Sequence, residues 1–459
     1  MHNRLRDPRL GELRGRSFFI VTLGCFRNEV ESDLLISGLL RLGLNRTDTL
    51  ETAHMIIVNT CGFIQEACEE GIDTVLEIDR LTKGREPRPP ILLVGCMGQR
   101  YGESLLKSMP EVSAVLGADW MDHLSETISE ITAGKRLRRS SLVPGQLCPA
   151  RDVDSSVNAT LFIRIADGCN RTCGFCTIPK IRGAYRSRPS EEILNEVTRL
   201  TGNRDREVVL LAQDLTSYGS DIPSEEILSS LLQRITQLEH VRWLRLLYLQ
   251  PEGITSELID EMAENPKICD YFDIPFQHAS PHVLRRMGRP GDGESYRSII
   301  SSIRARSPGA SLRTTLMVGY PGETEEDFEL LESFVGDIRF DWLGAFRFSP
   351  EPGTAAAQLT DRVPYDNAVM RYDRILELQD SIEASRAPRL VGTSTEVVID
   401  GVSEESGYDF VGRSCREAPI IDGLIYIRRK SEYGRDVRIG DFAEARITGV
   451  EGLDLVAEI

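Results

Sequence analysis

Apolar and polar positions follow one pattern three times in the amino-terminal part of the chain. Each time, a short run of apolar, largely β-branched residues leads directly into a cysteine. Runs without a polar face are typical of strands buried on both faces, as in a parallel sheet. Between the runs, apolar residues recur at three- and four-residue spacing, which predicts helices with one buried face. The predicted strands are residues 18–24, 55–60 and 91–95, and the predicted helices are residues 29–42 and 63–78.

Strand–helix alternation of this kind predicts an α/β fold with an open parallel sheet and right-handed crossovers. The alternation resumes after residue 160, where six further strand–helix units predict a partial (β/α)6 barrel similar to a TIM barrel. The chemistry of such a barrel lies at the carboxyl ends of its strands. The predicted strands are residues 160–166, 208–212, 243–247, 271–274, 311–318 and 342–348, with helices at 191–200, 225–238 and 325–334.

The pattern changes again near the carboxyl end of the chain. One long helix is predicted over residues 366–387, and after it come short alternating runs separated by glycines. Such runs predict a small antiparallel β-barrel. Its predicted strands are residues 395–399, 424–427, 442–447 and 455–459. The predicted domains are therefore residues 1–150, 151–388 and 389–459. The basic run 135–140, followed by Pro144 and Gly145, is interpreted as a solvated linker between the first two.

Composition is ordinary for a globular protein: of 459 residues, 41% are hydrophobic and 27% charged. No run approaches the roughly 18 apolar residues of a membrane helix, so no membrane partner is expected. Residues 1–7 carry charge where a signal peptide needs an apolar core. Ten cysteines without secretory features indicate metal ligands and free thiols instead of disulfides. We therefore expect a cytoplasmic protein.

The formal net charge of −17 argues against nucleic acid as the main partner, because proteins that bind the phosphate backbone usually present a basic surface. It favours a basic partner through electrostatic steering. A local basic stripe could still coexist with an acidic whole, so charge alone leaves RNA open. Residues 390–459 hold eight Lys and Arg against fourteen Asp and Glu, a net charge of −6.

Three cysteines in C-x3-C-x2-C spacing carry the most specific chemistry, and they are Cys169, Cys173 and Cys176. Thiolates are the ligands of a four-iron cubane cluster, and three of them leave one iron open to another ligand. An electron-transfer ferredoxin would normally close that position with a fourth Cys. The alternatives are a zinc site or three unrelated buried thiols, but structural zinc takes four ligands and no His or further Cys lies nearby.

Three more cysteines follow the predicted strands of the amino-terminal sheet: Cys25, Cys61 and Cys96. Ligand sites of open α/β sheets lie beyond the carboxyl ends of the strands, so the three thiols should meet at one edge. A second cluster with one open iron explains this convergence, and simple packing of buried thiols is the alternative. The remaining cysteines are interpreted as small apolar residues: Cys68, Cys148, Cys269 and Cys415.

Polar residues at the carboxyl ends of the barrel strands are candidates for cofactor contacts. They are Gln213, Asp214, Gln277 and His278. His278 fits a core position equally well. Arg182, Arg186 and Arg188 follow the cysteine loop and could face a carboxylate, or could be solvated loop residues. The turn 319–324 could approach a ligand, although entry into a helix capped by Thr324 is the plainer interpretation.

The C-x3-C-x2-C segment resembles the signature of radical S-adenosylmethionine (SAM) enzymes. Two three-cysteine sets in this order are similar to the methylthiotransferases of that superfamily, over nearly the whole chain. The amino-acid sequence resembles the ribosomal-protein branch more than the tRNA branch in four places: segments 23–28, 58–64 and 273–280, and Arg413-Ser414. Phe26-Arg27 departs from the Pro-Lys common in that branch, next to the ligand Cys25 but without altering it.

The resemblance implies two 4Fe–4S clusters and SAM as cofactors. SAM would bind the cluster at Cys169, Cys173 and Cys176 and yield a 5′-deoxyadenosyl radical that abstracts hydrogen from an unactivated carbon. The second cluster would hold the sulfur donor, and a second SAM would supply the methyl group. The implied product is a β-methylthio-aspartate in the twelfth protein of the small ribosomal subunit.

The same resemblance implies further partners and leaves two alternatives open. An external electron donor and a sulfur donor are expected partners, tRNA is not an expected substrate, and residues 389–459 resemble a TRAM domain. One alternative is a methylthiotransferase that acts on a tRNA adenosine. The other is a non-enzymatic two-cluster scaffold or electron-transfer protein.

Overall fold

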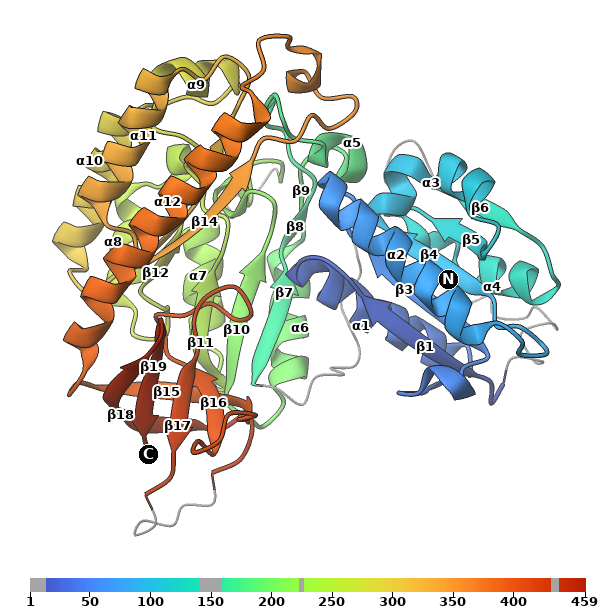
Figure 1. The fold of residues 1–459 in the computed structure, drawn as a ribbon. Helices are drawn as coiled ribbons and strands as arrows, with labels where there is room; N and C mark the ends of the chain where they lie inside the picture. The colour runs from blue at the N-terminus through green and yellow to red at the C-terminus, as the bar shows by residue number, and fades with distance from the viewer. Residues whose placement is uncertain (1–13, 141–158, 223–226, 431–436) are drawn as a thin grey trace. The chain divides into compact units, whose positions relative to one another are not determined.

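The computed structural model describes residues 14–140, 159–222, 227–430 and 437–459 (Figure 1). The chain divides into two compact units. The first comprises the described part of residues 1–155 together with Asp167–Arg171 and Cys176–Arg186. The second comprises Ser156–Ala166 as far as described, Thr172–Phe175 and Ser187–Ile459. The segment with Cys169, Cys173 and Cys176 is thus shared between the units.

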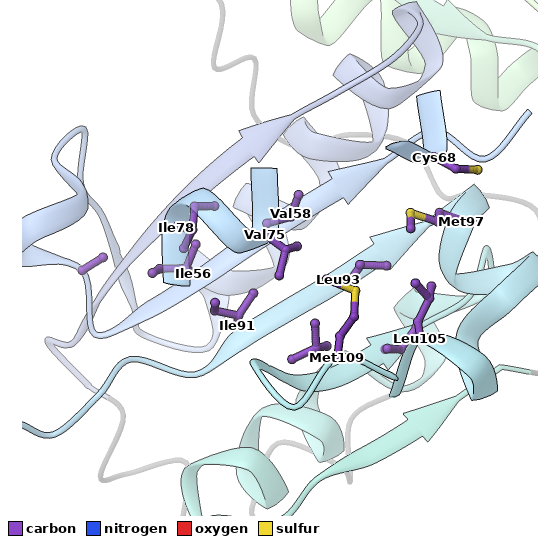
Figure 2. Packing of buried hydrophobic residues seen from close by; sticks show 13 residues of the cluster. Ile56, Val58, Cys68, Val75, Ile78, Ile91, Leu93, Met97, Leu105 and Met109 are labelled. Atoms are coloured by element: carbon purple, nitrogen blue, oxygen red, sulfur yellow. The ribbon is translucent and has the colours of Figure 1, made fainter. Parts of the chain in front are cut away.

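The first unit contains a six-stranded parallel sheet in the order β2-β1-β3-β4-β5-β6. The sheet and its helices enclose an apolar core that includes Ile56, Val58, Val75 and Leu93 (Figure 2). The predicted parallel α/β sheet is confirmed. Its strands are β1 (Ser17–Thr22), β2 (Asn45–Arg46), β3 (Met55–Thr60), β4 (Ile91–Gly95), β5 (Val112–Leu116) and β6 (Leu137–Arg139). Its helices are α1 (Phe26–Arg41), α2 (Gln65–Thr82), α3 (Cys96–Ser108) and α4 (Leu124–Thr132).

Strand β6 overturns the interpretation of residues 135–140 as a solvated linker. Leu137–Arg139 pairs in parallel with β5 at the edge of the sheet. The guanidinium of Arg139 donates to Glu130 over 2.6 Å, so the charged run is anchored to helix α4. Charged residues are common on edge strands, where they discourage pairing with another chain. Pro144, Gly145 and the domain boundary predicted at residues 150–151 lie outside the described residues.

The second unit contains the partial barrel that the sequence predicts. Two three-stranded parallel sheets, β11-β10-β7 and β12-β13-β14, are joined by a parallel bridge between Leu244 and Ile268. The strands are β7 (Thr160–Arg164), β10 (Arg206–Leu211), β11 (Val241–Leu246), β12 (Tyr271–Asp273), β13 (Ser311–Val318) and β14 (Trp342–Arg347). The helices that accompany them are α6 (Ser190–Thr201), α7 (Leu228–Thr236), α8 (Ser256–Glu264), α9 (Pro281–Arg286), α10 (Gly293–Arg306) and α11 (Glu325–Ile338).

Helix α12 (Tyr365–Arg386) leads into a closed five-stranded barrel around Val397, Ile425 and Ile447. Four of its pairings are antiparallel, as predicted, whereas β17 and β19 pair in parallel. The strands are β15 (Ser394–Val402), β16 (Phe410–Arg413), β17 (Ile425–Arg428), β18 (Phe442–Glu451) and β19 (Asp454–Glu458). Strand β16 was not predicted, because four residues that include a glycine give too short a pattern.

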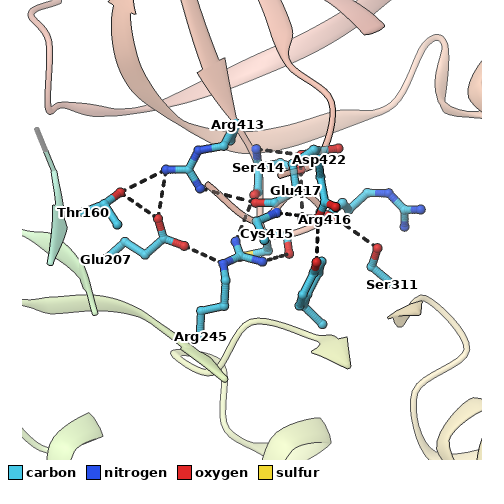
Figure 3. A network of polar contacts seen from close by, with 12 residues as sticks. Thr160, Glu207, Arg245, Ser311, Arg413, Ser414, Cys415, Arg416, Glu417 and Asp422 are labelled. Atoms are coloured by element: carbon cyan, nitrogen blue, oxygen red, sulfur yellow. Dashed lines mark hydrogen bonds and ion pairs between the residues drawn. The ribbon is translucent and has the colours of Figure 1, made fainter. Parts of the chain in front are cut away.

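A buried ion-pair network joins this small barrel to the amino ends of the large barrel's strands (Figure 3). Glu207 of β10 accepts from Arg245 over 2.6 Å and from Arg413 over 2.9 Å. Thr160 of β7 donates to the same carboxylate over 2.9 Å. Burial alone would raise the pKa of Glu207, but Arg413 and Arg245 outweigh it and lower that pKa to about 2. The carboxylate is therefore ionised at the junction.

Among the described residues, no helix combines the length and the apolar character needed to cross a membrane.

Candidate functional site

The three cysteine-bearing turns of the first unit contact one another. A β-carbon added at Gly24 would lie 2.5 Å from the β-carbon of Cys61, and one added at Gly62 would lie 2.5 Å from the backbone nitrogen of Met97. Only glycine allows such close approach, and Gly24 also has a φ of +95°. The prediction that the thiols after β1, β3 and β4 gather at one sheet edge agrees with these contacts. The thiols are those of Cys25, Cys61 and Cys96.

Two of these thiols, those of Cys61 and Cys96, lie in a setting that disfavours their charged forms in the absence of a metal. Burial, followed by the neighbouring Cys96 and Cys25, raises the pKa of Cys61 to about 12. Burial also raises the pKa of Cys96, against the opposing effect of Arg182. A bound metal centre reverses this balance, because a coordinated thiol is deprotonated by the positive charge of the metal. Clustered thiols that are costly to ionise alone therefore fit metal binding.

Arg182, at the end of helix α5 (Ile178–Arg182), lies inside this group. It is 2% exposed, pairs with Glu31 of α1 and donates through Nη2 to the sulfur of Cys96 over 3.0 Å. The interpretation of Arg182 as a solvated loop residue is therefore wrong. It is also wrong for Arg188, which is buried and pairs with Glu196 over 2.7 Å. Arg186 is partly exposed.

A second buried ion pair of the first unit flanks both cysteine segments. Arg27, two residues after Cys25, donates to Asp167 over 2.5 Å, and Asp167 lies two residues before Cys169. Asp167 also accepts from the backbone nitrogen of Gly168 over 3.1 Å. Arg27 is one of the two residues, Phe26 and Arg27, that differ from the Pro-Lys common in the ribosomal-protein branch, and its positive charge takes part in this ion pair.

The C-x3-C-x2-C loop is held by backbone hydrogen bonds in both units. In the first unit, the nitrogen of Cys169 donates to the carbonyl of Gly183 over 3.2 Å. In the second unit, the nitrogen of Gly174 donates to the carbonyl of Met287 over 2.8 Å. Cys169 is buried, and Cys173 and Cys176 are partly exposed. The loop thus leaves two of its thiols open to solvent or to a ligand.

Arg289 is a residue at this loop that sequence reasoning missed. One of its nitrogens lies 3.7 Å from the sulfur of Cys173, and the other donates to Gln250 over 3.0 Å and to the carbonyl of Pro275 over 2.9 Å. Its side chain is held on three sides at the carboxyl ends of the strands. No local signal marks it, because an arginine in a short loop after a helix is ordinary.

Two of the predicted contact residues follow strand β10. Both polar side-chain atoms of Gln213 are buried without a hydrogen-bond partner among the described residues. Buried polar groups without partners are uncommon, and a bound ligand would satisfy this amide. Asp214 is buried and accepts from Thr216 over 2.6 Å and from Ser217 over 2.8 Å. The carboxylate of Asp214 therefore has a structural role in the turn after β10.

The other two predicted contact residues follow strand β12. Gln277 has a φ of +69°, a conformation that is uncommon for a residue with a side chain and recurs at functional sites. His278 is fully buried, accepts from the nitrogen of Ser280 over 3.0 Å and lies 3.7 Å from Glu323. Burial lowers the pKa of His278 to about 3, so the ring is neutral. The cofactor contacts proposed for Gln213, Asp214, Gln277, His278 and Arg182 stay predictions.

Three other details of the sequence interpretation can be compared with the structure. Thr324 caps helix α11 by accepting from the nitrogen of Asp327 over 3.2 Å, as the plainer interpretation of that turn predicts. Cys68 packs into the apolar core of the first unit and Cys269 is buried, whereas Cys415 is partly exposed. Cys148 lies outside the described residues.

The ligand chemistry of the two thiol sets suits an iron–sulfur cluster. Among the described residues, no three Cys, His, Asp or Glu side chains are grouped so that they could hold one metal ion. In a cubane cluster, each of the three thiolates binds a different iron. Both three-cysteine sets supply this soft, thiolate-only ligand chemistry.

Comparisons with solved structures give the class of fold. A radical SAM methyltransferase, TsrM from Kitasatospora setae, aligns with a TM-score of 0.54 at 15% identity, over 72% of this chain and 75% of that chain. The cobalamin-dependent SAM radical enzyme OxsB aligns with a TM-score of 0.51 at 14% identity, over 80% of this chain and 57% of its own. The fold is therefore that of radical SAM enzymes.

Sequence comparisons narrow the class. Residues 163–335 match the radical SAM superfamily, 17–117 the uncharacterized protein family UPF0004, and 391–459 the TRAM domain. A protein of Symbiobacterium thermophilum named ribosomal protein uS12 methylthiotransferase RimO is 38% identical, over 95% of this chain and 90% of its own. A protein of the same name from Trichlorobacter lovleyi is 37% identical, over 98% and 99%. The chain belongs to the RimO family of radical SAM methylthiotransferases.

Proposed function

We propose that this enzyme inserts a methylthio group at the β-carbon of an aspartate in ribosomal protein uS12 by radical SAM chemistry. The observation that carries the proposal is the pairing of two three-cysteine sets with a radical SAM barrel. Support comes from relatives named ribosomal protein uS12 methylthiotransferase RimO, which are 37–40% identical over 89–98% of this chain. Because the relatives are covered over nearly their whole length, the resemblance includes all three predicted domains: residues 1–150, 151–388 and 389–459.

The two three-cysteine sets would form two separate cofactor sites. Cys169, Cys173 and Cys176 would hold the cluster that binds SAM, and Cys25, Cys61 and Cys96 would hold a second cluster. When bound, these cofactors supply the radical that abstracts hydrogen and the sulfur that replaces it. The protein's own side chains position these groups and exclude solvent. Gln213 is the strongest candidate for a SAM contact, because both ends of its buried amide lack a partner within the described residues.

The partners follow from the same chemistry. Reductive cleavage of SAM requires an external electron donor, and the added sulfur requires a sulfur donor. A basic ribosomal protein suits the net charge of −17. We propose a cytoplasmic location, where ribosomal proteins and reducing conditions meet.

The test is anaerobic reconstitution followed by iron analysis and product mass spectrometry. We expect about eight irons per chain, and about four after replacement of Cys25, Cys61 and Cys96 by Ala, with SAM cleavage retained. Full iron content in that variant would contradict the second cluster. Mass spectrometry of ribosomal proteins and tRNA from a deletion strain should show loss of the uS12 modification. Loss of a tRNA modification instead would assign the enzyme to the tRNA branch, and loss of neither would favour the scaffold function.

A further inference from the structure

Arg182 donates a hydrogen bond to Cys96, one of the three cysteines of the second cluster site. A structural role in its own loop would not require this contact. Its Nη2 donates to the sulfur of Cys96 over 3.0 Å, while Nη1 pairs with Glu31. The side chains of Arg182 and Glu31 are 3% and 2% exposed, and Cys96 is 8% exposed. All three residues belong to the first compact unit. A buried cation is thus held by a buried anion with one donor directed at a thiol.

This geometry has a defined effect on an iron–sulfur cluster. Hydrogen bonds to the sulfurs, net charge and solvent exposure set the reduction potential of such a cluster. An N–H donor and a positive charge both stabilise the more negative, reduced cluster. A planar guanidinium fixed by a carboxylate is well suited to this role, because its donors keep their direction.

We propose that Arg182 is a positioning residue that raises the reduction potential of the cluster at Cys25, Cys61 and Cys96, and that Glu31 moderates the effect. The inference rests on the proposed function, since it requires the second cluster. It also places a residue of the segment after Cys176 at the sulfur-donor site. One element, helix α5, thereby connects the loop that holds SAM with the ligand Cys96.

The two members of the ion pair have opposite expected effects. Arg182→Met removes the donor and leaves the negative charge of Glu31 beside the cluster, so the midpoint potential should fall. Glu31→Gln removes the negative charge and leaves the guanidinium, so the potential should rise. Arg182→Lys keeps the charge without the directed fork and should give a smaller fall. If Arg182 and Glu31 had only a structural role, every variant would retain less cluster, and the midpoint potential would not shift in opposite directions.

The experiment is a potentiometric titration followed by EPR. It uses the full chain with Cys169, Cys173 and Cys176 replaced by Ala, so that only the second cluster is observed. Arg136→Met is the matched control, because Arg136 caps the backbone carbonyls of Val112 and Leu106 in the same unit and should leave the potential unchanged. The titration is repeated on the chain with all six cysteines, which guards against a background that folds poorly.

Opposite shifts in Arg182→Met and Glu31→Gln support the proposal. Shifts in the same direction, or none in a fully loaded protein, overturn it while the second cluster stands. An unchanged potential together with weaker SAM binding in Arg182→Met would overturn it in favour of a SAM contact. With Arg182 and Glu31 unchanged, the second cluster should load both in the chain with three cysteines replaced and in the chain with all six. If it loads in neither, the proposed function loses that cofactor and this inference fails with it.

Discussion

Replacement of Arg413 by Met should destabilise the junction between the two barrels of the second unit. Arg413 is 2% exposed and donates to Glu207, which is fully buried, and to Asp400 over 2.7 Å. Methionine matches the length of the aliphatic part of the arginine but supplies no donor. The carboxylate of Glu207 would retain only Arg245 as a charged partner, and Asp400 would lose its ion pair.

Removal of one member of a buried ion pair typically costs about 3–5 kcal/mol, because the remaining charge is buried without compensation. We expect the lower end, about 3 kcal/mol, since Arg245 still pairs with Glu207 over 2.6 Å. Denaturant unfolding followed by tryptophan fluorescence measures it. Trp243 packs against Phe442 with ring centroids 4.9 Å apart, and Trp342 donates to the carbonyl of Arg416 over 2.7 Å, so both report on the junction.

The control is Arg446→Met, which removes an exposed arginine from the same small barrel and should change stability by no more than about 0.5 kcal/mol. A change below about 1 kcal/mol in Arg413→Met would refute the reasoning. The network also predicts that deletion of residues 390–459 damages the large barrel. Glu207 would lose Arg413, and Arg245 would lose the carbonyls of Cys415 and Ser414. Point substitutions are therefore the sounder way to test the small barrel's function.

Three further predictions concern pH, radical chemistry and recognition. Burial, opposed by Arg371, raises the pKa of Glu323 to about 7, so the folded state keeps a proton that the unfolded chain releases above about 4.5. Stability should fall by up to about 3 kcal/mol as pH rises from 4.5 to 7, and Glu323→Gln should flatten that slope in unfolding curves. Cys173→Ala should abolish 5′-deoxyadenosine formation measured by chromatography, and persistent cleavage would place the radical site elsewhere. Reversal of the exposed Glu404 and Glu405 to Lys should weaken uS12 binding a few-fold at low salt and less at high salt, unlike Glu66→Lys in the first unit.

The sequence was a good guide to elements whose pattern is long or repeated. The predicted strand 311–318 coincides with β13, and the three strands that precede cysteines lie within a residue or two of their predicted bounds. Some short strands were missed, because two to five residues carry little periodicity by themselves. They include β6, whose charges resemble a linker, and β5, which does not lead into a cysteine.

Only those residues of the candidate site that are marked by their spacing along the chain could be predicted from the sequence. Cysteines at fixed intervals, or directly after strands, are visible in one dimension. Arg182 could be marked as a candidate, but its partners lie 86 and 151 residues away in the sequence, so burial and pairing arise from tertiary packing. Arg289 has no local signal for the same reason, since its partner Cys173 is 116 residues away.

The acidic excess of the carboxyl-terminal barrel survives its docking onto the large barrel. Ion pairs across the junction use two basic and two acidic side chains of residues 390–459: Arg413 and Arg416, and Glu396 and Asp422. Among the described residues, ion pairs across the junction thus take up two charges of each sign, so they do not alter the segment's net charge of −6. The described pairs across the junction therefore leave the acidic excess in place. A surface of this sign opposes phosphate and favours a basic polypeptide, which agrees with a ribosomal protein as substrate more than with tRNA.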